Sequence, residues 1–282
     1  MAWPYFHRPG SISLLAACAL LAAGIALMLS SYNAAAESRY ALIITNQDYP
    51  TTVGQLTHTH EDGRILADVL ERLKFVVRWV RDADKATIMA AVAEQVGNLA
   101  ESKGQAVGFL YYSGHGAAAE KFGENYLLPV AAPISSAAQL PLLGVKLGDI
   151  VEAYTAAGAK ANFIVLDACR NVPFSAGTRA ATRGLVPVRE QSGLLIAFST
   201  DPGNVAVDDN IYSRALAEEM LSPGIEAVQM FRSVRRKVLA GFQLILVCAK
   251  WDRVTAAPAQ YTPIAEMDGS EHTLKQMAGG RL

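Results

Sequence analysis

The chain has 282 residues, of which 51% are hydrophobic and 18% are charged, so it has the composition of a globular protein with one large domain or two small ones. Its formal net charge of −1 argues against a nucleic-acid-binding protein, which would show a basic excess. Its three cysteines are too few for a fold built on disulfides.

The first 36 residues differ in character from the rest of the chain. An uncharged apolar stretch covers residues 11–30, and the small residues Ala34 to Ala36 follow it. This pattern predicts a secretory signal peptide that is cleaved after Ala36, and hence an exported protein that is periplasmic or secreted. The apolar stretch is also long enough to span a membrane, so an uncleaved N-terminal anchor is the alternative, and the only membrane contact that the sequence suggests.

After the leader, short apolar runs alternate with amphipathic segments. In chain order the sequence predicts a strand at 40–45, a helix at 61–73, a strand at 75–80, a helix at 84–99 with Asp84 as its N-cap, strands at 105–112 and 126–130, a helix at 147–157, strands at 162–167 and 193–199, and helices at 212–221 and 225–239. Because the strands are unbroken apolar runs between helices, the pattern indicates an α/β fold. Its central sheet is expected to be mostly parallel, with about six strands and helices on both faces.

The strand predicted at 162–167 leads into charged residues and a thiol. The segment FIVLDACRNVPF covers residues 163–174, so Cys169 follows closely on the apolar run. A free cysteine is most often a small buried hydrophobic residue. In parallel α/β sheets, however, chemistry gathers at the carboxyl ends of strands, which makes Cys169 a candidate nucleophile.

A histidine between two glycines ends the strand predicted at 105–112, in the segment SGHG at residues 113–116. The alternative is a loop histidine whose glycines only serve a turn. If both strands belong to one parallel sheet, His115 and Cys169 share an edge, because adjacent strands lie about 4.8 Å apart. A neutral imidazole can then take the thiol proton. The backbone amides of Gly116 and Cys169 are the candidate oxyanion site.

The motifs SGHG and DACR place their histidine and cysteine 54 residues apart, and several other segments accompany them in order. These segments are YYSGHG (111–116), NYLLPV (125–130), LDACR (166–170), AFST (197–200) and FRSVR (231–235). Together they resemble the caspase-like cysteine peptidases, and more specifically the bacterial metacaspase or orthocaspase branch. The resemblance implies a three-layer peptidase domain over residues 37–240, followed by a divergent tail over 241–282.

A hydroxyl group and an acid accompany the predicted dyad. Since side chains alternate along a strand, Ser113 shares a side with His115, and Asp167 shares a side with Cys169. The metacaspase branch carries aspartate two residues before its cysteine and prefers Arg or Lys before the scissile bond. The resemblance therefore implies a basic-residue pocket made of Asp62, Ser113 and Asp167. The alternative for Asp62 is an acid that complements a helix dipole.

The expected function is a cysteine endopeptidase with a His115–Cys169 dyad that cleaves proteins or peptides after Arg or Lys. The irregular segment 171–192 contains Arg179 and Arg183, which makes it a candidate for self-cleavage. The alternative is a caspase-fold interaction module with weak or no peptidase activity.

No cofactor or metal is expected. Some members of the resembled family are activated by calcium, and calcium activation stays the alternative here, although no acidic loop of this chain has a convincing calcium-ligand spacing. His58 and His60 have a spacing that could suit a metal, but the sequence offers them no further ligands.

Overall fold

The structure is a computed structural model, and it describes residues 37–51, 53–119, 123–169, 192–199 and 210–241. The predicted leader (1–36), nearly all of the candidate self-cleavage loop (171–192) and nearly all of the tail (241–282) lie outside these residues. Within the described ranges, no helix is long and apolar enough to cross a membrane.

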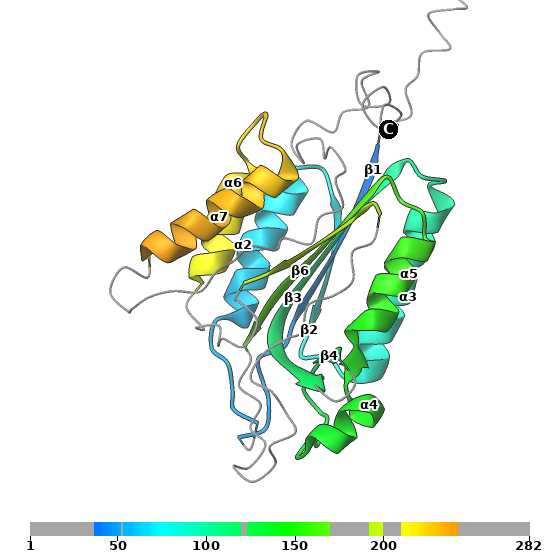
Figure 1. Cartoon of the computed structure of the whole chain (residues 1–282), viewed down its shortest axis with the longest axis vertical. Coiled ribbons are helices and arrows are strands. Elements are labelled where there is room, and N and C mark those ends of the chain that lie inside the picture. The colour runs from blue at the N-terminus through cyan, green and yellow to red at the C-terminus, as the bar shows by residue number, and fades with distance from the viewer. Residues whose placement is uncertain (1–36, 52, 120–122, 170–191, 200–209, 242–282) are drawn as a thin grey trace, which may run out of the picture. The chain divides into compact units, whose positions relative to one another are not determined.

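A seven-stranded sheet forms the centre of the domain (Figure 1). Its strands are β1 (Ser38–Thr45), β2 (Val76–Arg81), β3 (Ala106–Ala119), β4 (Glu124–Leu127), β5 (Val145–Lys146), β6 (Ala161–Cys169) and β7 (Leu194–Phe198). Five of them run parallel in the order β2-β1-β3-β6-β7, while β4 and β5 add an antiparallel extension to β3. This arrangement confirms the predicted α/β fold class with a mostly parallel sheet.

Helices cover both faces of the sheet (Figure 1). One face carries α2 (Thr59–Arg72), α6 (Ile211–Met220) and α7 (Ala227–Gly241), and the other carries α3 (Lys85–Glu101) and α5 (Leu147–Ala156). The N-cap prediction for α3 is confirmed, because the Asp84 carboxylate accepts a hydrogen bond from the Thr87 amide at 2.7 Å. A 3₁₀ helix η2 (Ala137–Gln139), the short α4 (Leu140–Leu143) and β5 were not predicted, because they are too short to show a periodicity.

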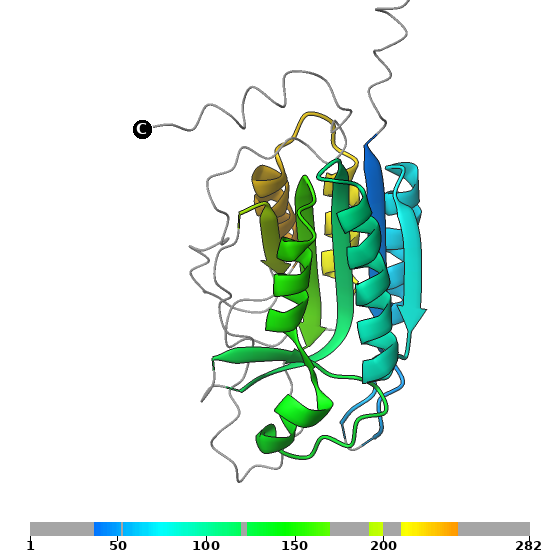
Figure 2. The ribbon, with the colours of Figure 1, turned by 90° about the vertical axis from the view of Figure 1, so that its right-hand side faces the viewer.

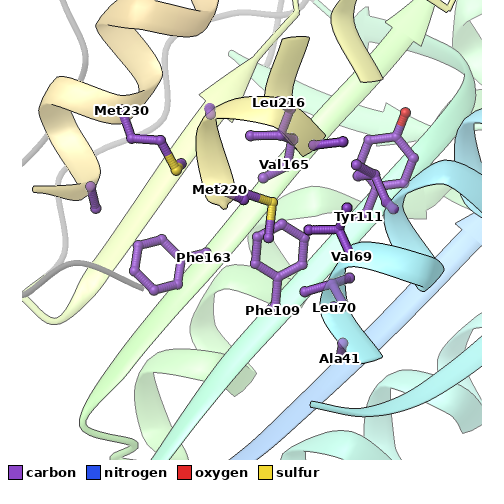
Figure 3. Close-up of a cluster of buried hydrophobic side chains, with 14 of the residues drawn as sticks. Ala41, Val69, Leu70, Phe109, Tyr111, Phe163, Val165, Leu216, Met220 and Met230 are labelled. Carbon is purple, nitrogen blue, oxygen red and sulfur yellow. The ribbon is translucent and has the colours of Figure 1, made fainter. Parts of the chain in front are cut away.

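Alternate strand residues divide the core into two layers. Phe109, Tyr111, Phe163 and Val165 pack beneath α2, α6 and α7, where they meet Leu216, Met220 and Met230 (Figure 3). The residues between them, such as Leu110 and Ile164, pack against the helices of the opposite face. Since side chains alternate along a strand, every odd-numbered position of β3 and β6 near this core belongs to the α2–α6 face.

The prediction that the third strand ends at Tyr112 is wrong, since β3 continues to Ala119. The parallel pairing with β6 reaches His115, and from Gly116 onward the strand pairs antiparallel with β4. Figure 2 shows how the strand curves over this part of its course. Small residues allow this course: a Cβ atom at Gly114 would lie 2.8 Å from the hydroxyl oxygens of both Tyr49 and Tyr112. His115 therefore lies inside a strand and not in a terminal loop, and the glycine before it makes room for two tyrosines.

Candidate active site

The predicted site residues meet at the seam between β3 and β6. The backbone register pairs Ser113 with Asp167 and His115 with Cys169. Ser113 faces α2, because its hydroxyl donates to Asp62 in the first turn of that helix. The predicted dyad thus occupies directly opposite positions of two neighbouring parallel strands, about 4.8 Å apart.

The His115 ring is buried and oriented by a backbone carbonyl. Only 4% of this residue is exposed, and its Nε2 atom lies 2.7 Å from the Gly54 carbonyl oxygen. A carbonyl can only accept a hydrogen bond, so Nε2 carries the proton in the neutral ring. The other nitrogen, Nδ1, is then the atom of the imidazole that can take up a proton.

Two tyrosines surround the backbone of His115. The His115 amide donates to the Tyr49 hydroxyl at 3.0 Å, and the two rings pack at a tilt of 54° with centroids 4.5 Å apart. The Tyr49 hydroxyl in turn donates to the Leu128 carbonyl at 2.9 Å. The Tyr112 hydroxyl lies 3.2 Å from the Tyr49 hydroxyl and donates to the His115 carbonyl at 2.7 Å. Two neighbouring hydroxyl groups thus bind the amide and the carbonyl of His115.

The amides of the predicted oxyanion site belong to the same seam. The His115 amide and carbonyl both point toward the β1 side of β3, where they meet Tyr49 and the Leu128 amide. Because amide directions alternate along a strand, the Gly116 amide points toward β6, the strand that ends at Cys169. Both candidate amides therefore lie along the β3–β6 seam.

Asp62 is buried in the first turn of α2, with 4% of the residue exposed. Its Oδ1 atom accepts from Asn210 Nδ2 at 2.6 Å and from Ser213 Oγ at 2.5 Å. Its Oδ2 atom accepts from Ser113 Oγ at 3.4 Å. Asp62 consequently does more than complement a helix dipole, because it ties the start of α6 to α2 and β3.

Asp167 forms the second acid of this region and is only partly buried. The Tyr111 hydroxyl donates to its Oδ2 atom at 2.9 Å. Burial, together with the charges of Asp167 and Asp62, raises the pKa of Tyr111 well above its ordinary value, so the phenol stays protonated and keeps donating. Burial and Asp167 also raise the pKa of Tyr212. The predicted pocket therefore contains two carboxylates with neutral hydroxyl groups beside them.

His58 and His60 make contacts other than a shared metal site. His58 Nδ1 lies 2.9 Å from the Thr57 hydroxyl, whereas His60 contacts Asp82 and Thr45. The described part of the chain contains no group of three or more His, Cys, Asp or Glu side chains that could hold a metal ion.

The structure brings all the predicted site residues to one region and adds partners that the sequence did not reveal. These are Tyr49, Gly54, Tyr111, Asn210 and Ser213. An asparagine directly before a helix suggests a cap, but the Asn210 side chain makes no cap hydrogen bond and donates to Asp62 instead, from a backbone with a left-handed φ of 56°. Tyr49 and Gly54 had no sequence signal, since they belong to a loop without periodicity.

Comparison with known proteins agrees with this geometry. The model of the caspase domain family matches residues 38–262, which include every described strand and helix. The match continues beyond residue 240, where the sequence predicted the end of the domain. No curated protein matches the chain.

Proposed function

Because the chain belongs to the caspase domain family, whose members are cysteine peptidases, we propose that it is a cysteine endopeptidase with Cys169 as nucleophile and His115 as base. The observation that carries the proposal is the opposition of these two residues in the β3–β6 register, with His115 Nε2 bound to the Gly54 carbonyl. That bond leaves Nδ1 to act in proton transfer.

The proposed reaction has two stages. His115 Nδ1 takes the Cys169 proton, and the thiolate attacks the substrate carbonyl, whose oxyanion is held by the amides of Gly116 and Cys169. The imidazolium returns its proton to the leaving amine, which departs as the acyl-enzyme forms. His115 then removes a proton from water as the water oxygen attacks the acyl carbon. The carbon–sulfur bond breaks, the carboxylic acid product leaves, and the Cys169 thiolate takes the proton back from the imidazolium. No cofactor takes part.

The proposed specificity is for Arg or Lys before the scissile bond. Asp62, Ser113 and Asp167 form an acidic region beside the dyad, and Tyr111 donates to Asp167 as a neutral phenol. A guanidinium or ammonium group would be stabilised there by charge-assisted hydrogen bonds, whereas an acidic substrate side chain would be repelled. Proteins or peptides with basic residues are the proposed substrates, and the proposed location is outside the cytoplasm, as the leader implies.

The competing function is an interaction module that keeps the caspase fold but has lost activity. The bond between His115 and Gly54 favours the enzyme, because a ring held in one tautomer suits proton transfer and has no evident use in a scaffold. A thiol-directed peptide inhibitor with arginine at the cleaved position distinguishes the two functions. We expect one covalent adduct, located at Cys169 by mass spectrometry, that an aspartate-based inhibitor does not form. Absence of any arginine-directed adduct would favour the interaction module.

Self-cleavage is a further part of the proposal. The segment 171–192 begins two residues after the nucleophile and contains Arg179 and Arg183, so its arginines can reach a basic-specific site in the same or a neighbouring molecule. We expect purified wild-type protein to cut itself after one of these arginines, as N-terminal sequencing of the fragments would show. The Cys169→Ala variant should stay intact. The same fragments from that variant would instead indicate a contaminating protease.

A further inference from the structure

The loop between β1 and α2 carries both groups that orient the His115 side chain. The Tyr49 ring packs at a tilt against the imidazole, its hydroxyl accepts from the His115 amide, and the Gly54 carbonyl lies 2.7 Å from Nε2. Both contacts come from a segment without helix or strand. The orientation of the ring therefore depends on whatever holds this loop in place.

Asp82, directly after β2, holds the backbone of this loop. Its Oδ1 atom accepts from the amides of Gln47 at 2.7 Å and Asp48 at 3.0 Å, the two residues before Tyr49. The Gln47 carbonyl then accepts from the amides of Tyr49 and Leu56, which closes the loop. Asp82 adopts a left-handed φ of 45°, a costly conformation for a residue other than glycine, and it aims the carboxylate at these amides.

Asp82 is ionised at neutral pH. Partial burial opposes its charge, but the amides of Asp48 and Gln47 and the His60 ring outweigh burial and lower the pKa of the carboxyl group. A carboxylate that accepts two amide bonds on one oxygen retains its other oxygen for a separate partner. That partner is His60.

His60 orients Asp82 through a directional chain of hydrogen bonds. Trp79 Nε1 can only donate, and it donates to Thr45 Oγ1 at 3.0 Å. When the imidazole is neutral, the Thr45 hydroxyl gives its own hydrogen to His60 Nδ1 at 2.9 Å. His60 Nε2 then carries the ring proton and donates it to Asp82 Oδ2 at 2.8 Å. One imidazole thereby links β1 and β2 to the carboxylate that holds the loop.

We propose that Asp82 and His60 are positioning residues for His115: they fix the loop backbone so that Tyr49 and the Gly54 carbonyl keep the imidazole in one tautomer and orientation. His60 orients the Asp82 carboxylate, Asp82 holds the amides of the two residues before Tyr49, and the loop then orients His115. The catalytic consequence rests on the proposed peptidase function, but the state of the His115 ring can be measured without a substrate.

The test compares Asp82→Ala with Asp84→Ala. Asp84 is a matched control, because it lies two residues away and also accepts a backbone amide bond, but it caps α3 and does not contact the loop. Long-range ¹H–¹⁵N NMR of purified protein in a Cys169→Ala background reports which ring nitrogen of His115 is protonated. We expect the Nε2–H tautomer in that background and in the Asp84 variant, and a mixture of tautomers in Asp82→Ala.

Kinetics supply the second readout, in protein that retains Cys169. Asp82→Ala should lower kcat for an arginine amide substrate by roughly 10- to 100-fold with little change in KM, because misorientation of a catalytic group affects the chemical step. Asp84→Ala should not show this selective loss of kcat with an unchanged KM.

Two His60 variants extend the test if Asp82→Ala fails to fold. His60→Gln can replace the Nε2 donor to Asp82, whereas His60→Asn can replace only the contact with Thr45. We expect the glutamine variant to retain more kcat and more of the single tautomer than the asparagine variant.

The outcomes separate the two proposals. A tautomer change in a protein without peptidase activity would support the positioning role and refute the peptidase. Full activity, with the same His115 spectrum and kcat in the Asp82 and Asp84 variants, would overturn the positioning role alone.

Discussion

Replacement of Cys169 or His115 by alanine is expected to abolish hydrolysis of arginine amide substrates while the fold is retained. Each variant should lose about 10⁴-fold or more in kcat, because removal of either member of a nucleophile–base pair disables the whole unit. Steady-state kinetics with purified protein, together with circular dichroism of each variant, would measure both parts of this prediction. The double variant should be no worse than either single variant, since the two residues act together.

Cys248→Ser is the matched control for the thiol, and it should keep its activity. Cys248 lies outside the described residues, and no sequence motif connects it with His115. Full activity in Cys169→Ala or His115→Ala would refute the proposed mechanism. Loss of activity in Cys248→Ser alone would show that the nucleophile had been assigned to the wrong cysteine.

The second large effect is expected at Asp167, the partly buried acid of the proposed pocket. Asp167→Ala should weaken transition-state binding of Arg and Lys substrates by about 1–3 kcal/mol, the usual contribution of a charge-assisted hydrogen bond. The measurement is kcat/KM for matched peptides that differ only in the residue before the scissile bond. Wild-type protein should refuse aspartate at that position, and a clear preference for aspartate would refute the pocket assignment.

Asp167 is a cleaner test of specificity than Asp62, because it accepts from the Tyr111 hydroxyl, whereas Asp62 accepts from three side chains. Asp62→Ala would leave the buried donors of Asn210 and Ser213 without their acceptor, which costs stability as well as binding. Asp68→Ala is a suitable charge control, because Asp68 is an exposed acid on α2 whose side chain is 61% accessible. If the control weakens Arg substrates as much as Asp167→Ala does, the effect reflects the overall charge of the protein and not a pocket.

Much of this protein follows from its sequence because secondary structure and burial leave local patterns. Unbroken apolar runs such as residues 163–166 predict buried strands, and their alternation with amphipathic helices predicts a parallel sheet covered on both faces. The same period of two is enough to place Ser113 on the side of His115 and Asp167 on the side of Cys169. In the folded domain Ser113 lies opposite Asp167, and His115 lies opposite Cys169, along the seam between β3 and β6.

The length of β3 was decided by tertiary contacts. Glycine and alanine are weak strand formers, so the segment 114–119 carries little strand signal of its own. It continues as a strand because β4 supplies antiparallel partners and because two tyrosine hydroxyls fill the space above Gly114.

Strand order and side-chain alternation can be read from the chain, and they are enough to predict the fold class and a shared sheet edge for His115 and Cys169. The adjacency of β3 and β6, and the groups that surround the two residues, depend on tertiary contacts. Tyr49 reaches His115 across 66 residues of chain, and Asn210 reaches Asp62 across 148. Periodicity reports which face of an element is buried. Hydrogen-bond partners depend instead on which loops converge in space, and residues so far apart leave no local pattern to read.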